Sequence, residues 1–459
     1  MIPLGRALGR SGHPAAPLAC GAIFLPRSPT LRRKRPCHCS VHDGDEVDAA
    51  GDDSEGWAAA LSREAARMRQ SMDDDEFTDL SEFAEVAQNA GLLLPQQMAV
   101  ELQAQVWSEL GPDGGFESED FELVQRIGRI SVQAAATTSD AQSSTAVVAY
   151  IARYVACGLY ARPPAALVKE YLPVAKSIAL NELLLLHHLC GVPEDKHQAI
   201  MAAPSSEVPV VPLLGYFTSS PSEEAQLVGK QDRSMATVAE EPESLWLVYS
   251  WEGLRPLALY NQAGPPVVKP RLFQSRQAAE EEAWQARVRM LRRIAVLLLQ
   301  AVDYCHSADV VHGSISSGSV LMNTAEDIPR LDLVALKLDG FGFGKFAPAP
   351  GNLESFEAAK RADIVACGLL LAETFACGLA DGPSGVMTPP TLRRLLFTVF
   401  PADVEGFRAY LHEDGHHERF AALLENAEAR DFLHAMLYNT AQQQATALQL
   451  LQHDFLTSP

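Results

Sequence analysis

Hydrophobic and polar residues follow two different spacings along the chain, and the change from one to the other divides it into two parts. Between residues 120 and 250 the pattern is strand-like, with short segments rich in apolar residues between polar or proline-containing stretches, which predicts strands with one helix among them. The expected strands cover residues 121–132, 146–155, 165–171, 208–217 and 245–250, and the expected helix covers residues 175–189. Residues 219–243 are rich in Ser, Glu and Gln and predict a long surface loop.

Apolar residues recur at helical spacing in the second part. Residues 278–307 carry a continuous apolar stripe, which predicts a long amphipathic helix, and residues 361–377 are apolar on nearly every side, which predicts a buried helix. Ahead of the strands, residues 79–110 predict two short amphipathic helices, separated by Pro95. A small strand-rich part followed by a larger helical part indicates an α+β fold with two lobes.

The composition is that of a folded protein. Of the 459 residues, 47% are hydrophobic and 21% are charged, which is typical of globular chains with two or three domains. Lys and Arg number 37 against 58 Asp and Glu, and the net charge of −21 argues against a nucleic-acid-binding protein that relies on a basic face. No apolar run reaches the ~18 residues of a transmembrane helix, so none is expected. The cysteines lack zinc-ligand spacing, and we expect no metal site.

The first 42 residues differ in charge from the rest of the chain. They contain seven Lys and Arg residues and no acidic residue, with Ser, Ala and Pro between them. This composition is typical of an organelle transit peptide, and we expect a chloroplast protein, with the mitochondrion as the second choice. A basic tail that stays attached is the alternative. Residues 43–118 then combine an acidic linker with the short helices.

Six short segments occur in a characteristic order along the chain. In the strand-rich part they are residues 166–169 (ALVK), 181–182 (NE) and 245–253, and in the helical part they are residues 302–321, 337–345 (KLDGFGFGK) and 362–368. Together they resemble the lysine strand, the glutamate helix, the hinge, the catalytic loop, the magnesium segment and the buried helix of the protein kinase superfamily. The resemblance implies a bilobal protein-kinase-like domain at 119–456, with an N-lobe at 119–253 and a C-lobe at 254–456.

Where the family needs carboxylates for its chemistry, this chain has other residues. The resemblance puts Ser314 at the position of the catalytic aspartate, Ser319 at that of the metal-binding asparagine and Gly340 at that of the metal-binding aspartate. Because phosphoryl transfer depends on charge stabilisation and on positioning, these substitutions imply that no catalytic or metal-binding residue remains. Asp339 precedes Gly340, and if Phe341 and Gly342 keep the family's register we expect its carboxylate to point away from this site. The alternative is a slipped backbone that swings the carboxylate inward, and even then no base would replace Ser314.

The nucleotide site is incomplete in the same comparison. Gly128 is the single glycine where the family has three, and Leu167 replaces the small residue above the adenine. If a nucleotide binds, the resemblance assigns it to five residues, namely Gly128, Lys169, Glu182, Ser250 and Trp251. The Lys169–Glu182 pair either holds phosphates or only braces the lobe, and Trp251 either stacks on adenine or fills the crevice between the lobes. We expect no cofactor, although ATP binding without a well-formed magnesium site stays open.

The residues that hold the family's two lobes together are kept. They would stack through both lobes or anchor the catalytic loop, and they are His312, Phe341, Leu186, Leu213 and Asp363. Retained packing beside missing catalytic groups is typical of a pseudokinase. We therefore predict a catalytically inactive scaffold or regulatory binding protein of the chloroplast, with an unidentified protein partner and no nucleic acid.

Two other interpretations stay open. Residues 245–253 are also similar to the thylakoid state-transition kinases, which implies an unusual or weak ATP-dependent serine/threonine protein kinase. In the other interpretation the helices at 79–110 are the working part of the chain. They would either pack on the kinase-like domain as an extension or present an apolar face to a partner.

Overall fold

The computed structural model describes residues 96–111, 114–133, 143–156, 164–202, 208–222, 243–263, 274–347, 353–380, 387–415, 417–438 and 445–458. These residues belong to one compact unit, Phe77–Pro459. The predicted transit peptide at 1–42, the acidic linker and the first of the two short helices lie outside the described residues. Most of the predicted loop at 219–243 does so as well.

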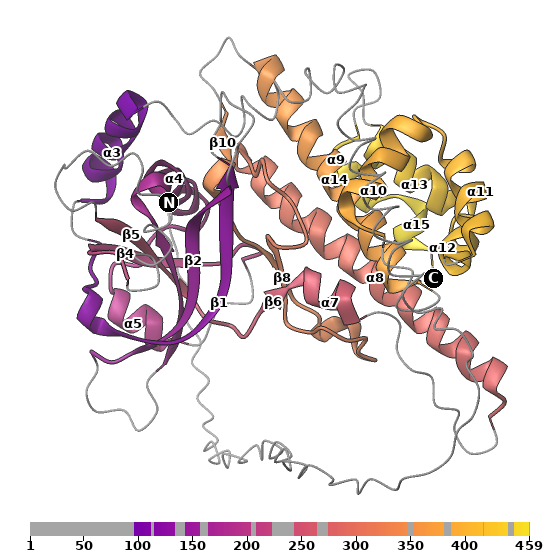
Figure 1. The fold of residues 1–459 in the computed structure, drawn as a ribbon, viewed down its shortest axis with the longest axis horizontal. Helices are drawn as coiled ribbons and strands as arrows, with labels where there is room; N and C mark the ends of the chain where they lie inside the picture. The colour runs from indigo at the N-terminus through magenta and orange to yellow at the C-terminus, as the bar shows by residue number, and fades with distance from the viewer. Residues whose placement is uncertain are drawn as a thin grey trace, which may run out of the picture. The chain divides into compact units, whose positions relative to one another are not determined.

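The strand-rich part is a five-stranded antiparallel sheet with a helix packed against it (Figure 1). Its strands are β1 (Phe121–Gln133), β2 (Ser143–Tyr154), β3 (Ala165–Tyr171), β4 (Leu213–Ser219) and β5 (Ser244–Ser250), in the order β1-β2-β3-β5-β4. The helix is α4 (Lys176–Cys190). Because neighbouring residues of a strand point to opposite faces, Leu167 and Tyr171 pack with α4 in the main core, whereas Val168 joins a smaller core on the other face.

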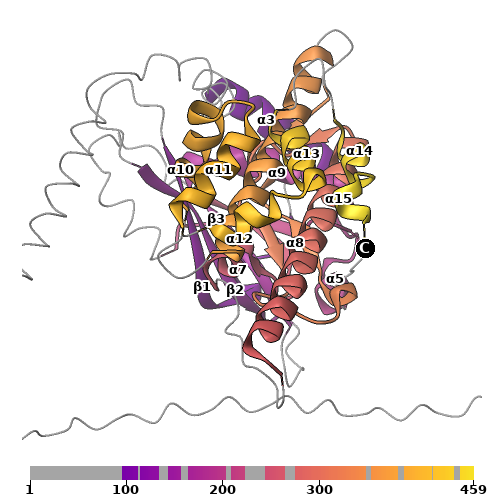
Figure 2. The same cartoon turned by 90° about the vertical axis from the view of Figure 1, so that its right-hand side faces the viewer.

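The second part is mostly helical (Figure 2). Its helices are α7 (Leu257–Ala263), α8 (Arg276–Ser307), α9 (Leu353–Gly378), α10 (Pro389–Arg394), α11 (Val404–Asp414), α12 (Glu418–Leu423), α13 (Ala427–Leu437), α14 (Ala447–Leu451) and α15 (Asp454–Thr457). Short strands β6 (Arg255–Pro256), β8 (Val320–Met322) and β9 (Leu336–Leu338) form one sheet, and β7 (Val310–Val311) pairs with β10 (Lys345–Phe346). A single hydrophobic core runs from α4 through α8 to α9 and joins the two parts.

The predicted α+β arrangement, a sheet followed by a helical part, is confirmed. β3 has the predicted bounds, and the buried helix expected at 361–377 begins earlier, at Leu353, but is almost wholly buried from Asp363 on. Sequence reasoning missed α5 (Lys196–Met201) and α7. Helices of six or seven residues complete at most about two turns, too few for a helical period to stand out.

An extension ahead of the sheet packs on it. In α3 (Gln96–Leu110), Val106 is fully buried in the main core, and the Trp107 ring stacks on Tyr216 of β4 with the ring centroids 5.6 Å apart. The Tyr216 hydroxyl donates a hydrogen bond to the carbonyl of Gly111, and Phe116 enters the smaller core. These contacts favour packing of this helix on the domain over the alternative in which it presents its apolar face to a partner.

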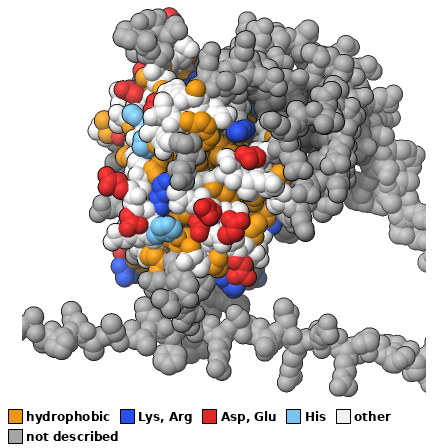
Figure 3. All heavy atoms as spheres, turned by 90° about the vertical axis from the view of Figure 1, so that its left-hand side faces the viewer, with side chains coloured by type: hydrophobic (Ala, Val, Ile, Leu, Met, Phe, Trp, Pro, Cys, Tyr) orange, Lys and Arg blue, Asp and Glu red, His pale blue; other side chains and the backbone are white. Residues whose placement is uncertain are grey.

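Charges are interspersed on the face of the molecule that carries the sheet. Figure 3 shows acidic, basic and histidine side chains there among apolar ones, without separation by kind. Within the described ranges, no helix is both long and apolar enough to cross a bilayer, in agreement with the sequence-based expectation.

The docking of the extension can be tested at Gly114. A Cβ atom at this position would overlap the carbonyl oxygen of Tyr216. We expect Gly114→Ala to lower the free energy of unfolding by about 1–3 kcal/mol because the two segments must separate, as measured by urea denaturation. The control is Gly318→Ala, whose Cβ would meet its nearest neighbour at 3.7 Å, an ordinary contact. Equal stability of the two variants would contradict the packing described here.

Candidate functional site

Lys169 and Glu182 form a buried ion pair between the sheet and α4. Lys169 lies on β3, between the two residues of that strand that face α4, and Glu182 lies in the second turn of the helix. Lys169 Nζ is 3.1 Å from Glu182 Oε1, and the two side chains are 3% and 2% exposed. Because both charges are almost fully buried, removing either side chain would leave the other as a buried charge without a partner, which is strongly destabilising.

Two tyrosine hydroxyls complete the hydrogen bonds of Glu182. Tyr249 donates to Oε1 at 2.6 Å and Tyr171 to Oε2 at 2.7 Å, and the Lys169 ammonium lies 4.6 Å from the centre of the Tyr249 ring. Burial alone raises the pKa of Glu182, but the ammonium and the two hydroxyls outweigh burial and hold that pKa below its ordinary value. Sequence reasoning missed both tyrosines, although alternation along β3 puts Tyr171 on the same face as Lys169.

Asp339 is a second carboxylate on the same ammonium. Its Oδ1 lies 2.6 Å from Lys169 Nζ, and its side chain is 13% exposed. The prediction that Asp339 points away from this site is wrong, because Gly340 has a left-handed backbone with a φ of 81° and the ammonium holds the carboxylate inward. Burial alone lowers the pKa of Lys169, but Asp339 and Glu182 together raise that pKa above its ordinary value. One positive charge therefore faces two negative charges.

The serines at the family's catalytic and metal positions make contacts within their own loop. Ser319 Oγ donates to the carbonyl of Ser314 at 3.0 Å and accepts from the N–H of Ser316 at 2.9 Å. The Ser319 carbonyl accepts from the N–H of Asp339 at 2.9 Å. Gly340 lies beside Ser319, since a Cβ built at Gly340 would be 3.8 Å from the Ser319 Cβ. The Ser319 side chain thus fixes the shape of the loop.

These groups do not fit the magnesium and nucleotide site that the resemblance implies. Magnesium is held in proteins by one or two carboxylates together with phosphates and water. Here the Ser319 hydroxyl is engaged in the loop, Gly340 has no side-chain oxygen, and the Asp339 carboxylate is paired with Lys169. No reaction step through a metal follows from this set of donors.

The other residues assigned to a nucleotide lie along the sheet and hinge. Gly128 lies in β1, Ser250 ends β5, and Trp251 follows it, half-buried against the main core. Leu167 is only 3% exposed and lies directly opposite Tyr249 in the pairing of β3 with β5. A buried leucine and a buried tyrosine therefore occupy the sheet beside Lys169.

Asp363 anchors the loop that contains Ser314. At 2% exposure, its Oδ2 accepts from the N–H of His312 at 2.8 Å, and its Oδ1 accepts from the N–H of Gly313 at 2.9 Å. His306 Nε2 lies 3.1 Å from the same Oδ2. Two adjacent backbone amides thus donate their hydrogen bonds to one buried carboxylate on α9.

Four buried side chains connect α4, the sheet and the loop, and they are Leu186, Leu213, His312 and Phe341. The rings of His312 and Phe341 lie with their centroids 4.5 Å apart. Asn181 Nδ2 donates to the carbonyls of Gly342 and Gly344 at 3.0 and 2.9 Å, which ties α4 to the short helix η4 (Phe341–Phe343). The helix that carries Glu182 is therefore held by the segment around η4 as well as by the sheet.

A second buried ion pair joins the hinge to β9, and sequence reasoning missed it. Lys337 Nζ lies 2.6 Å from Glu252 Oε1, and the side chains are 3% and 10% exposed. The sequence did contain an indication of this pair, because Lys337 is flanked by leucines in a short apolar segment. A lysine buried in such a segment requires a partner of opposite charge. This pair fixes the hinge to the strand that leads to Asp339.

The buried imidazole of His312 should make the free energy of unfolding depend on pH. Burial lowers the pKa of His312 from its ordinary 6.5, against the opposing effects of Asp363 and of the hydrogen bond to the Asp339 carbonyl. The unfolded chain therefore takes up a proton near that pH that the folded chain does not, so the free energy of unfolding should fall as the pH drops below about 6.5. We expect urea unfolding to show a smaller loss between pH 7.5 and 5.5 in His312→Gln. Equal losses in both proteins would show that His312 does not contribute.

A search of solved structures finds a likeness to a protein kinase domain. The chain is similar to that in the crystal structure of Rad53 kinase domain and SCD2, with 16% sequence identity and a TM-score of 0.39, over 74% of this chain and 89% of that chain. No family model matches the chain, and no curated protein does. The chain's own geometry is that of an α+β fold, in which a sheet with a buried lysine–glutamate pair stands beside a helical part with an aspartate-anchored loop.

Proposed function

We propose that this protein is a catalytically inactive pseudokinase that acts as a scaffold or regulatory binding protein. The observation that carries the proposal is the pairing of Lys169 with both Glu182 and Asp339. A nucleotide phosphate would have to displace Asp339 from the ammonium, and it would approach a group in which negative charge already exceeds positive charge. In a site this little exposed, such repulsion is only weakly screened.

The loop supports the same conclusion. A kinase positions and deprotonates its acceptor hydroxyl with a carboxylate. Ser314 is half-buried, its amide donates to His312 Nδ1 at 3.2 Å, and its neutral hydroxyl is a poor proton acceptor at neutral pH. The described loop thus keeps its anchored shape but lacks the charge that the reaction requires.

The proposed location and partner follow from charge. The basic, acid-free composition of residues 1–42 supports a chloroplast protein, with the mitochondrion second. The net charge of −21 supports a protein partner over a nucleic acid.

A phosphoryl-transfer assay tests the proposal. The purified chain is incubated with labelled ATP, magnesium or manganese, and generic protein acceptors. We expect no transfer above that of Ser314→Ala. Transfer that is robust in the wild type and lost in Lys169→Met would overturn the proposal and favour the alternative, a weak serine/threonine kinase. The intact Lys169–Glu182 pair is the observation that favours this alternative.

A further inference from the structure

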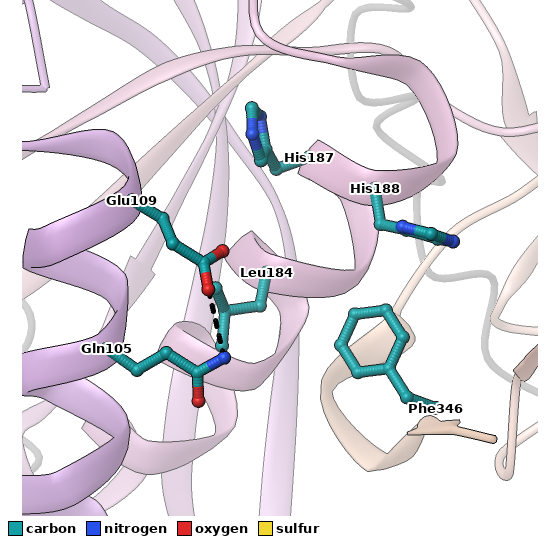
Figure 4. Close-up of a pocket in the computed structure, with 6 residues that line it drawn as sticks. All are labelled: Gln105, Glu109, Leu184, His187, His188 and Phe346. Atoms are coloured by element: carbon teal, nitrogen blue, oxygen red, sulfur yellow. Dashed lines mark hydrogen bonds between the residues drawn. The ribbon is translucent and has the colours of Figure 1, made fainter. Parts of the chain in front are cut away.

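A cavity of about 550 Å³ lies where the extension meets α4 and the strand that follows η4. It is lined by Gln105 and Glu109 of α3, by Leu184, His187 and His188 of α4, and by Phe346 of β10. Figure 4 shows Gln105 and Glu109 on one wall and His188 and Phe346 on the other. The volume is in the range of pockets that accept a small molecule or a single large side chain.

The polar groups of the cavity are held in place by the protein. Gln105 Nε2 donates to Glu109 Oε1 at 3.0 Å, which orients the carboxylate. His188 Nε2 lies 3.0 Å from the carbonyl of Ala308, and its ring meets the Phe346 ring edge-on with the centroids 5.2 Å apart. His187 Nδ1 is buried without a hydrogen-bond partner among the described residues. A buried, unpaired ring nitrogen beside a cavity points to a ligand that supplies the missing bond.

The charge and the apolar character of the residues that line the cavity indicate which class of ligand it can bind. The Glu109 carboxylate disfavours an anion, and the described residues contain no cluster of three His, Cys, Asp or Glu that could hold a metal ion. The Phe346 ring is 38% exposed, and Leu184 is apolar and nearly buried. A planar guanidinium fits these groups, since it can stack on an aromatic ring and pair with a carboxylate through two N–H groups. Its remaining N–H groups can supply the hydrogen bond that His187 Nδ1 lacks.

We propose that this cavity binds an arginine side chain presented by a partner protein. The guanidinium pairs with Glu109, its plane lies on Phe346, and the aliphatic stem packs on Leu184. The excess of negative charge on the chain as a whole attracts a cationic segment. This inference rests on the proposed binding role, and it locates one contact of that role on the side of α4 that faces α3.

The test uses N-acetyl-arginine amide as the probe and N-acetyl-citrulline amide as its neutral counterpart. Binding to the full chain is followed through the imidazole NMR signals of His187 and His188, which are assigned with the variants His187→Gln and His188→Gln. We expect the arginine probe to shift both signals and to bind at least fivefold more tightly than the citrulline probe. Equal affinities, or no shift with arginine, would overturn the inference.

The variant Glu109→Gln provides a second test of the proposed pairing. Because Glu109 is exposed, removing its negative charge should leave the fold intact. We expect this variant to bind the arginine probe at least fivefold more weakly than the wild type. The matched control is Glu281→Gln on α8, where Gln285 donates to Glu281 at 2.8 Å with the same spacing of four residues. Unchanged binding in Glu109→Gln would exclude the pairing. If the arginine probe did not bind as expected and the phosphoryl-transfer assay still showed no transfer, the arginine-binding proposal would be rejected and the pseudokinase proposal would stand.

Discussion

Lys169→Met should lower the free energy of unfolding by about 3–5 kcal/mol, the cost of leaving buried charges without their partner. The substitution preserves much of the side-chain volume but removes the ammonium from Glu182 and Asp339, which lie 3.1 and 2.6 Å from it. The loss should shrink on acidification. The pKa of Glu182 lies below its ordinary 4.5, so the stability that this group provides is present above that pH and fades as the pH falls through the folded value.

Urea denaturation at pH 7.5 and at a pH well below 4.5 measures both effects. The control is Lys360→Met, because Lys360 pairs with Glu357 at the surface with side chains 22% and 48% exposed. An exposed pair of this kind contributes roughly 0–1 kcal/mol. If Lys169→Met were no more destabilising than Lys360→Met, the pairing of Lys169 with Glu182 and Asp339 would not stabilise the fold.

Asp363→Ala is expected to lower the free energy of unfolding by about 2–4 kcal/mol, because it breaks a buried hydrogen-bond network. It leaves the buried N–H group of His312 without an acceptor, which alone costs about 1–3 kcal/mol, and it also removes the acceptor of the N–H of Gly313, an exposed residue. His306 loses its contact as well. Thermal or urea unfolding gives the stability, and hydrogen exchange at the amides of His312 and Gly313 reports on the loop directly.

Asp195→Ala is the matched control for this change. Asp195 also accepts a backbone N–H, that of Gln198 at 2.8 Å, but it does so at the exposed start of α5. Loss of such a cap costs about 0.5–2 kcal/mol. If the two variants lost the same stability and the amides of the loop stayed protected, Asp363 would not be the anchor of the loop.

The fold was accessible from the sequence because its signals are local and periodic. The short segment that follows Pro163 and Pro164 predicted β3 with its bounds, and helical spacing predicted α4 and α8 to within two residues. Sequence reasoning missed α5 and α7 because helices of six or seven residues complete fewer than two turns, too few for a helical period to stand out. The extension α3 was found as a helix, but its docking was left open, since the stacking of Trp107 on Tyr216 joins residues more than 100 positions apart.

The site was harder to predict because its contacts depend on side-chain direction. The resemblance identified Lys169 and Glu182 as site residues. The register that it implied, however, predicted that the Asp339 carboxylate points away from Lys169, whereas it contacts the ammonium. One glycine explains the error, since Gly340 adopts a left-handed backbone that a pattern of residue types does not reveal. Tyr249 was placed correctly on β5, yet nothing in the alternation of that strand shows that its hydroxyl reaches Glu182 on another element.

The most direct test of the account is a calorimetric titration of the full chain with ATP, with and without magnesium, in the wild type and in Asp339→Asn. The site around Lys169 should not take a magnesium-bound nucleotide, because the Asp339 carboxylate is already bound to Lys169. We therefore expect no magnesium-dependent binding to either protein, and any metal-independent binding to be stronger in Asp339→Asn, where the ammonium is partly released. Tight, magnesium-dependent binding to the wild type that Asp339→Asn abolishes would contradict the account.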